Sequence, residues 1–207
     1  MIEKLRRRAW GTVTARRVYA GPPRRGWQRI LVRVSEPVAT LYPDWPQHAA
    51  RLRDGVVDLT AEQLAIRAGP EHGTIWQLAA HTAGARVFWL CQVFGQPGVE
   101  RTPFEQTLVD GTGWEDEPDH PRSGEELRWA LDSTLAVVAD CLARWTIDSL
   151  GVTATRVLGD GRKQEHTRAS VLNRLHSHDA FHAGEISQLL GLHGLPPIDL
   201  WARRPRG

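Results

Sequence analysis

Two histidines, His178 and His182, are the residues of this 207-residue chain whose spacing most clearly allows joint chemistry. They lie four positions apart, so on a helix their side chains stack one turn apart, with about 5–6 Å between Cβ atoms. Two imidazoles at that spacing can reach one metal ion. Apolar residues share their stripe, which predicts that it faces the protein interior: Val171, Leu175 and Leu189. The alternative interpretation is a pair of core histidines bonded to neighbouring groups, because buried imidazoles need partners.

A third histidine favours the metal interpretation. His81 lies in the middle of another amphipathic segment, on a stripe with Leu78 and Ala85. Two helices of a bundle can direct facing residues to one interior point. Three neutral histidines with open positions for water are typical of catalytic zinc or a related divalent metal ion. The spacing therefore makes His81, His178 and His182 candidate metal ligands, with hydrogen-bonded core histidines as the open alternative.

Other polar residues near these three have less specific interpretations. Glu185 follows His182 by about one turn, where its carboxylate either orients a ligand, acts as a base, or is solvated or structural. Asp179 stands where an HExxH metalloprotease needs glutamate, and its shorter reach argues against a protease. Five further histidines fall near expected helix ends or in loops and are predicted to be solvated: His48, His72, His120, His166 and His193.

Four substantial helices are predicted to position these residues, over 45–58, 74–95, 123–145 and 167–194. Capping boxes mark several helix starts, including that of a short helix before 69–70: Thr60 with Gln63, Thr74 with Gln77, and Ser123 with Glu126. Asp44 is a candidate N-cap for the first long helix. Residues 146–166 indicate either a small hairpin or an ordered loop. Because each amphipathic stripe must face another, an all-α, four-helix bundle is the expected fold.

Composition limits the function classes. No apolar run reaches the roughly 18 residues that span a membrane, and no secretory signal is evident. Residues 1–45 hold ten basic and three acidic residues, whereas 46–207 hold sixteen and twenty-one. We therefore expect a basic N-terminal extension over 1–34, disordered or irregular, and a mildly acidic domain over 35–207. This distribution does not favour nucleic-acid binding. The two cysteines, Cys91 and Cys141, form no CxxC motif and are expected to be reduced.

Several short segments resemble the DinB-like family, in the right order over about residues 38–200. The run from His178 to Ile186 is similar to that family's HxxxHxG(Q/E)I signature, and Thr74 to His81 resembles the stretch leading to its first metal histidine. Residues 59–64 and 194–197 resemble its linker and its usual ending. The resemblance implies a four-helix bundle of the DinB type with a metal held by His81, His178 and His182.

The resemblance also implies a function and partners. It implies a divalent metal ion, zinc or nickel, and related branches use a low-molecular-weight thiol in transferase or isomerase reactions. We expect a cytoplasmic metal-dependent enzyme that acts on a small molecule, with a homodimer implied by the family. A metal-dependent hydrolase of a small substrate is one alternative. A non-catalytic, metal-stabilised stress-response module is another. Catalytic residues and substrate-binding residues are not identified by the sequence.

Overall fold

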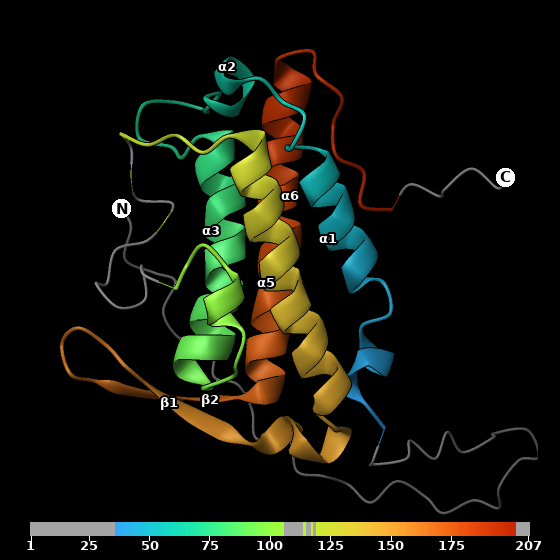
Figure 1. Ribbon diagram of the computed structural model, residues 1–207, viewed down its shortest axis with the longest axis vertical. Coiled ribbons are helices and arrows are strands. Elements are labelled where there is room, and N and C mark those ends of the chain that lie inside the picture. The colour runs from blue at the N-terminus through green and yellow to red at the C-terminus, as the bar shows by residue number, and fades with distance from the viewer. Residues whose placement is uncertain (1–35, 106–113, 115–116, 118, 202–207) are drawn as a thin grey trace, which may run out of the picture. The chain divides into compact units, whose positions relative to one another are not determined.

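The computed structural model describes residues 36–105, 114, 117 and 119–201, and this part of the chain is mainly helical. The expected N-terminal extension over 1–34 lies outside the described residues. Four longer helices run side by side (Figure 1): α1 (Trp45–Asp54), α3 (Ile75–Val87), α5 (Gly124–Arg144) and α6 (Arg168–Leu192). Helix α3 packs against α5 and α6, and α1 packs against the same two helices. Their buried side chains contribute to one apolar core.

Shorter elements connect these helices: η1 (Val38–Leu41), α2 (Ala61–Leu64), η2 (Phe88–Val93), η3 (Val99–Arg101) and η5 (Ile147–Gly151). Element η2 is a π-helical turn that continues directly from α3. Such turns are rare and occur often at functional sites. No helix among the described residues has the length and apolar character required to cross a membrane.

The predicted capping boxes are confirmed at the starts of α2, α3 and α5. At the start of α3, Gln77 N donates to Thr74 Oγ1 at 3.3 Å, and Thr74 N donates to Gln77 Oε1 at 2.9 Å. Each box satisfies two backbone donors that the first helical turn leaves unpaired. Thr167 caps α6 near the predicted start. Asp44 is the N-cap residue of α1, but its side chain makes no capping hydrogen bond.

Two helices differ in extent from the expectation. Helix α1 ends at Asp54 rather than at 58; Gly55 is its C-cap residue, and Val56 and Val57 after it are buried in the core. The segment expected to be one helix over 74–95 is α3 followed by the wider π-helical turn. It does stop at Gly95, whose φ of 62° lies in the left-handed region that favours glycine.

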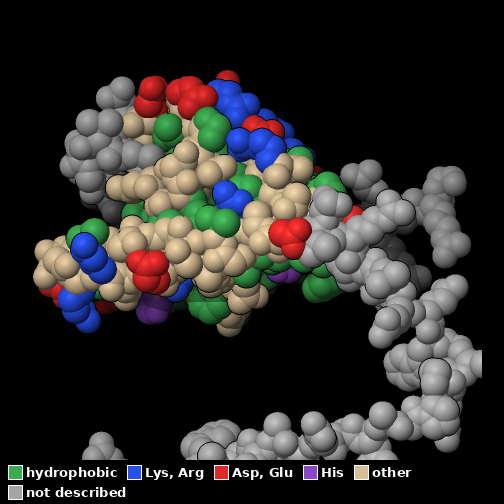
Figure 2. All heavy atoms as spheres, turned by 90° about the horizontal axis from the view of Figure 1, so that it is seen from below, with side chains coloured by type: hydrophobic (Ala, Val, Ile, Leu, Met, Phe, Trp, Pro, Cys, Tyr) green, Lys and Arg blue, Asp and Glu red, His purple; other side chains and the backbone are tan. Residues whose placement is uncertain are grey.

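A β-hairpin corrects the expectation of an all-α fold to a mainly helical one. Strands β1 (Thr153–Val157) and β2 (Lys163–Thr167) pair antiparallel over the segment where the sequence left a hairpin or a loop open. Gly161 provides the positive φ of 80° that the turn requires. Figure 2 looks onto the hairpin end, where basic, acidic and histidine side chains all reach the surface of the described residues.

Candidate metal centre

The structure brings the three predicted histidines together at the edge between α3 and α6. His178 and His182 lie one turn apart on α6, with 3.1 Å between their Nε2 atoms. His81 reaches across from α3, and its Nε2 atom lies 3.2 Å from that of His178. One ring nitrogen from each residue lies within 4.8 Å of those of the other two. Three nitrogens from two helices therefore converge on one small volume.

The apolar stripe predicted that the histidines face the interior, but the point where they converge lies at the surface. His81 is exposed, and His178 and His182 are only half-buried. The apolar residues of the stripe are indeed in the core, but helix α6 turns the two histidines toward its boundary with solvent. A site at this edge is open to a small molecule from one side, which a core site would not be.

Hydrogen bonding on α6 favours a ligand role for His182. Its Nδ1 atom lies 2.6 Å from Glu185 Oε2. A carboxylate at that position stabilises the tautomer that carries its proton on Nδ1 and leaves the Nε2 lone pair directed at the other two rings. Of the roles considered for Glu185 from the sequence, orientation of a ligand is the one that this contact supports.

The charge states of the two α6 histidines also suit a cation. Burial, followed by the nearby His182 and His81, lowers the pKa of His178 to about 4, so its imidazole is neutral near pH 7. Burial lowers the pKa of His182 as well, although Glu185 opposes this effect. Neutral imidazole is the form that coordinates a metal.

The donor set fits a divalent metal ion. The Nδ1 atom of His178 is buried and has no hydrogen-bond partner among the described residues. Its polar contacts there are made through Nε2, with the Nε2 atoms of His81 and His182. Lone pairs gathered at such distances repel unless a proton or a cation lies among them. Imidazole nitrogens suit zinc and nickel, and three of them leave further coordination positions open.

A cavity of about 270 Å³ lies beside this centre. Glu185, which contacts His182, forms part of its wall, and leucines from α3 and α6 line much of the remainder. The lining residues are Ala68, His72, Gly73, Leu78, Glu185, Gln188, Leu189 and Leu192. Mostly apolar walls with a few polar groups are common in small-molecule sites.

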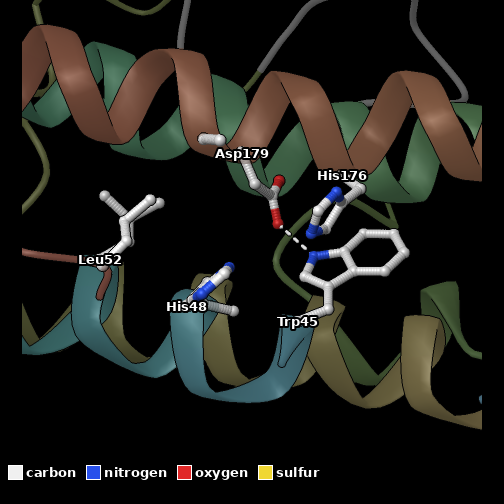
Figure 3. Close-up of a pocket in the computed structure, with 8 residues that line it drawn as sticks. Trp45, His48, Leu52, His176 and Asp179 are labelled. Carbon is white, nitrogen blue, oxygen red and sulfur yellow. Dashed lines mark hydrogen bonds between the residues drawn. The ribbon is translucent and has the colours of Figure 1, made fainter. Parts of the chain in front are cut away.

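Next to the histidine centre, a buried ion pair at Asp179 also joins α6 to α3. Arg86 Nη2 donates to Asp179 Oδ2 at 2.8 Å and Arg86 Nε donates to Asp179 Oδ1 at 3.3 Å. Trp45 Nε1 of α1 donates to Asp179 Oδ2 at 2.8 Å (Figure 3). Arg86 also donates to the Leu131 carbonyl of α5 at 3.1 Å and to Thr134 Oγ1. The pair therefore connects all four longer helices.

This network was not predicted from the sequence. Asp179 was considered only as the residue in place of a protease glutamate, and no role was assigned to Arg86. The sequence did contain a signal for it: Arg86 and Asp179 each place a charge among the apolar residues of a helix. Charges buried in a protein are usually paired with each other, so two such residues are candidate partners.

Two further histidines pack beside the network. His48, predicted to be solvated, is 7% exposed, because α1 holds it against Trp201 and His176. Burial, followed by the charge of His176, lowers the pKa of His48. His176 was not singled out from the sequence, and its ring packs edge-on against Trp45 (Figure 3). These rings fill the space between α1 and α6 and lie away from the candidate metal centre.

The cysteines do not contribute to the site. Cys91 and Cys141 are free and buried, as expected for reduced thiols. Burial raises the pKa of each to about 11, so both remain protonated near neutral pH. Neither is suited to act as a nucleophile.

Comparison with known proteins gives a family and a fold. The model of the DinB superfamily matches residues 45–186, a span that contains all three histidines. Among solved structures, a DinB-like protein from Bacillus cereus ATCC 10987 is similar to this chain, with a TM-score of 0.57 and 17% sequence identity. The similarity covers 79% of this chain and 97% of that one. No curated protein sequence matches the chain.

Proposed function

This chain belongs to the DinB superfamily, and we propose that it binds a divalent metal ion, zinc or nickel, through His81, His178 and His182. The observation that carries the proposal is the convergence of three ring nitrogens within 4.8 Å of one another. The contact from Glu185 to His182 Nδ1 supports it, because metal-binding histidines usually donate their other ring proton to such an acceptor. We also propose that α1, α3, α5 and α6 form the four-helix bundle of the DinB type.

We propose further that the centre is catalytic. A divalent ion there would act as a Lewis acid that lowers the pKa of a bound thiol or water or polarises a carbonyl group. The exposed edge at His81 gives a small substrate access, and the neighbouring cavity offers space for it. Glu185 would hold His182 in the coordinating tautomer.

Activation of a low-molecular-weight thiol for S-transfer or isomerisation is the reaction we prefer. Both cysteines of the chain are buried with a pKa of about 11, so the thiol would come from solution. Metal-dependent hydrolysis of a small substrate is the alternative reaction. The homodimer that the resemblance implies stays a prediction.

Metal analysis of the purified protein tests the first part of the proposal. We expect about one metal ion per wild-type chain and its loss in His81→Ala, His178→Ala and His182→Ala. His120→Ala is a matched control, because that histidine is largely exposed and lies outside the centre. Unchanged occupancy in any one of the three variants would remove that residue from the ligand set.

A turnover assay tests the second part. The metal-loaded protein is mixed with a thiol and chlorodinitrobenzene, so that the thiol sulfur displaces chloride and its proton passes to the solvent. We expect the rate to depend on the metal and to fall at least tenfold in His178→Ala. An equal rate in the metal-free protein would leave a metal-stabilised, non-catalytic role in its place.

A further inference from the structure

Two guanidinium groups gather on one aromatic side chain near the histidine centre. Trp89, in η2, has Arg156 of β1 at 5.4 Å and Arg174 of α6 at 4.8 Å from its ring centroid. Arg156 also lies 5.0 Å from the centroid of Phe88. Cation–π contacts of this kind hold a guanidinium in place and leave its N–H donors free for a ligand.

Half of the arginines of the described residues have acidic partners, but these two do not. Neither Arg156 nor Arg174 forms an ion pair with a described carboxylate. Ion pairs with carboxylates are made by Arg53, Arg86, Arg101, Arg122, Arg128 and Arg162. Like charges on one indole repel one another, and a bound anion would remove that repulsion.

The hairpin presents no carboxylate to this cluster. Arg156 pairs with Gln164, and His166 lies two residues further along β2. Successive side chains of a strand point to opposite faces, so these three share the face toward Trp89. Glu165 lies between Gln164 and His166 and therefore points away from it. The face of the hairpin directed at η2 is thus basic and polar.

His166 supports the closeness of the two guanidinium groups. Its ring lies 4.7 Å from that of Trp89, between centroids. Burial lowers the pKa of His166 first, the charges of Arg174 and Arg156 lower it further, and Glu165 opposes them. Its Nε2 atom is buried and has no hydrogen-bond partner among the described residues. The cluster therefore contains a buried ring nitrogen without a hydrogen-bond partner, in addition to two arginines without ion pairs.

The cluster lies within reach of the histidine centre along both helices. Arg174 precedes His178 by four residues, about 6 Å of helical rise. Trp89 follows His81 by eight residues, on the order of 12 Å along α3 and η2. A small molecule held by an anionic group at the cluster can therefore place another atom at the histidines.

We propose that Arg156 and Arg174 form an anion-binding subsite for a carboxylate or phosphate group of a small molecule. The planar fork of arginine matches both of these groups. The role of the subsite in binding the substrate of the histidine centre rests on the proposed function, whereas the anion binding itself does not.

Calorimetric titration of the metal-free protein with citrate and, separately, with pyrophosphate tests the subsite and distinguishes a carboxylate from a phosphate. We expect saturable binding of at least one anion. Arg156→Gln and Arg174→Gln should each weaken it about tenfold or more, the size expected for a lost charged hydrogen bond. Arg128→Gln is the matched control, because it removes the same charge from α5. Arg174→Lys, which keeps the charge but loses the fork, should bind with intermediate affinity.

Absence of saturable binding to the wild-type protein would overturn the proposal, as would equal weakening by Arg128→Gln. Thermal melts of each variant identify any loss of binding that is caused by unfolding. If Arg174→Gln unfolds, the more conservative Arg174→Lys still tests whether the guanidinium binds the anion. His178→Ala should lose metal and keep anion binding, so the subsite and the metal centre can fail separately.

The link to substrate is tested with the turnover assay. Glutathione, which carries two carboxylates, is compared with its diethyl ester as the thiol. We expect Arg174→Gln to raise KM for glutathione at least fivefold and to leave KM for the ester unchanged. Equal KM values for the two thiols in the wild-type protein would restrict the subsite to anions unrelated to turnover.

Discussion

His178 and Asp179 are neighbours in α6, yet they belong to two regions with opposite physical character. Asp179 lies in the interior, where Arg86 and Trp45 satisfy its carboxylate. His178 lies at the edge between α3 and α6, where its Nδ1 atom has no described partner and its Nε2 atom faces two other imidazoles. The carboxylate of Asp179 thus accepts three hydrogen bonds, whereas Nδ1 of His178 has no partner among the described residues.

The difference separates stability from ligand binding along the same two helices. The Arg86–Asp179 pair fixes α3 against α6, and this fixed spacing is what places His81 beside His178. The histidines contribute little to that packing, because they lie at its boundary with solvent. Changes in the buried pair should therefore affect folding first, and changes in the histidines should affect ligand binding first.

The largest expected effect follows from breaking the buried pair. Asp179→Ala leaves the fully buried Arg86 without its carboxylate, and such losses cost about 3–5 kcal/mol of unfolding free energy. We expect a fall in Tm on the order of 10 °C, measured by circular dichroism.

The double variant Arg86→Met with Asp179→Leu is the control for this prediction, because it removes both charges together. It should recover much of the lost stability, though not all of it, since Trp45 Nε1 loses its acceptor. A single variant as stable as the wild-type protein would refute a stabilising role for the pair.

Metal removal should have the next largest effect, and it concerns the histidine centre. With free metal at about 100 times the dissociation constant, binding to the folded state contributes about 2.7 kcal/mol. Chelation should lower the Tm of the wild-type protein accordingly. His81→Ala and His182→Ala should melt near the chelated wild-type protein and show no response to chelator. A response to chelator as large as that of the wild-type protein would contradict the assigned ligand set.

Glu185 should have a smaller effect that is confined to the metal centre. Glu185→Ala removes the acceptor for His182 Nδ1, and loss of such a partner typically lowers metal affinity about 10- to 100-fold. Glu185→Gln keeps an acceptor oxygen, so its metal affinity should lie between those of Glu185→Ala and the wild-type protein. Competition with a chromophoric chelator measures the affinities. Gln188→Ala, one turn further along α6, is the control and should bind metal normally.

Interactions between residues close in the sequence were predicted from it, whereas interactions between residues far apart were not. Capping boxes such as Thr74 with Gln77 involve residues three apart, so their spacing alone predicts the helix starts. The partners of the buried pair, Arg86 and Asp179, are 93 residues apart, and nothing local identifies them as partners. The three histidines were found because two of them share a helix turn and because the chain resembles a known family.

The position of the histidines relative to the core was the part that periodicity predicted wrongly. An apolar stripe shows which side of a helix is mostly buried, but it does not show where the stripe reaches the edge of the neighbouring helix. Half-buried residues at that edge, such as His178 and His182, carry the same spacing as core residues. Exposure at the candidate site is therefore a property of the packing of α3 on α6.

The smallest expected effect tests whether helix α3 positions His81 through local structure or through the buried pair. Thr74→Ala removes the side-chain acceptor for Gln77 N and should cost about 1 kcal/mol of unfolding free energy, measured by urea denaturation. Metal stoichiometry should not change, because Arg86 still fixes the last turn of α3 against α6, five residues after His81. Thr40→Ala is the control: it removes an exposed side-chain hydrogen bond in η1, outside the longer helices, and should leave metal stoichiometry unchanged. If Thr74→Ala lowered metal occupancy, the placement of His81 would depend on the start of α3, and the separation between the stabilising and ligand-binding sides of the molecule would be incomplete.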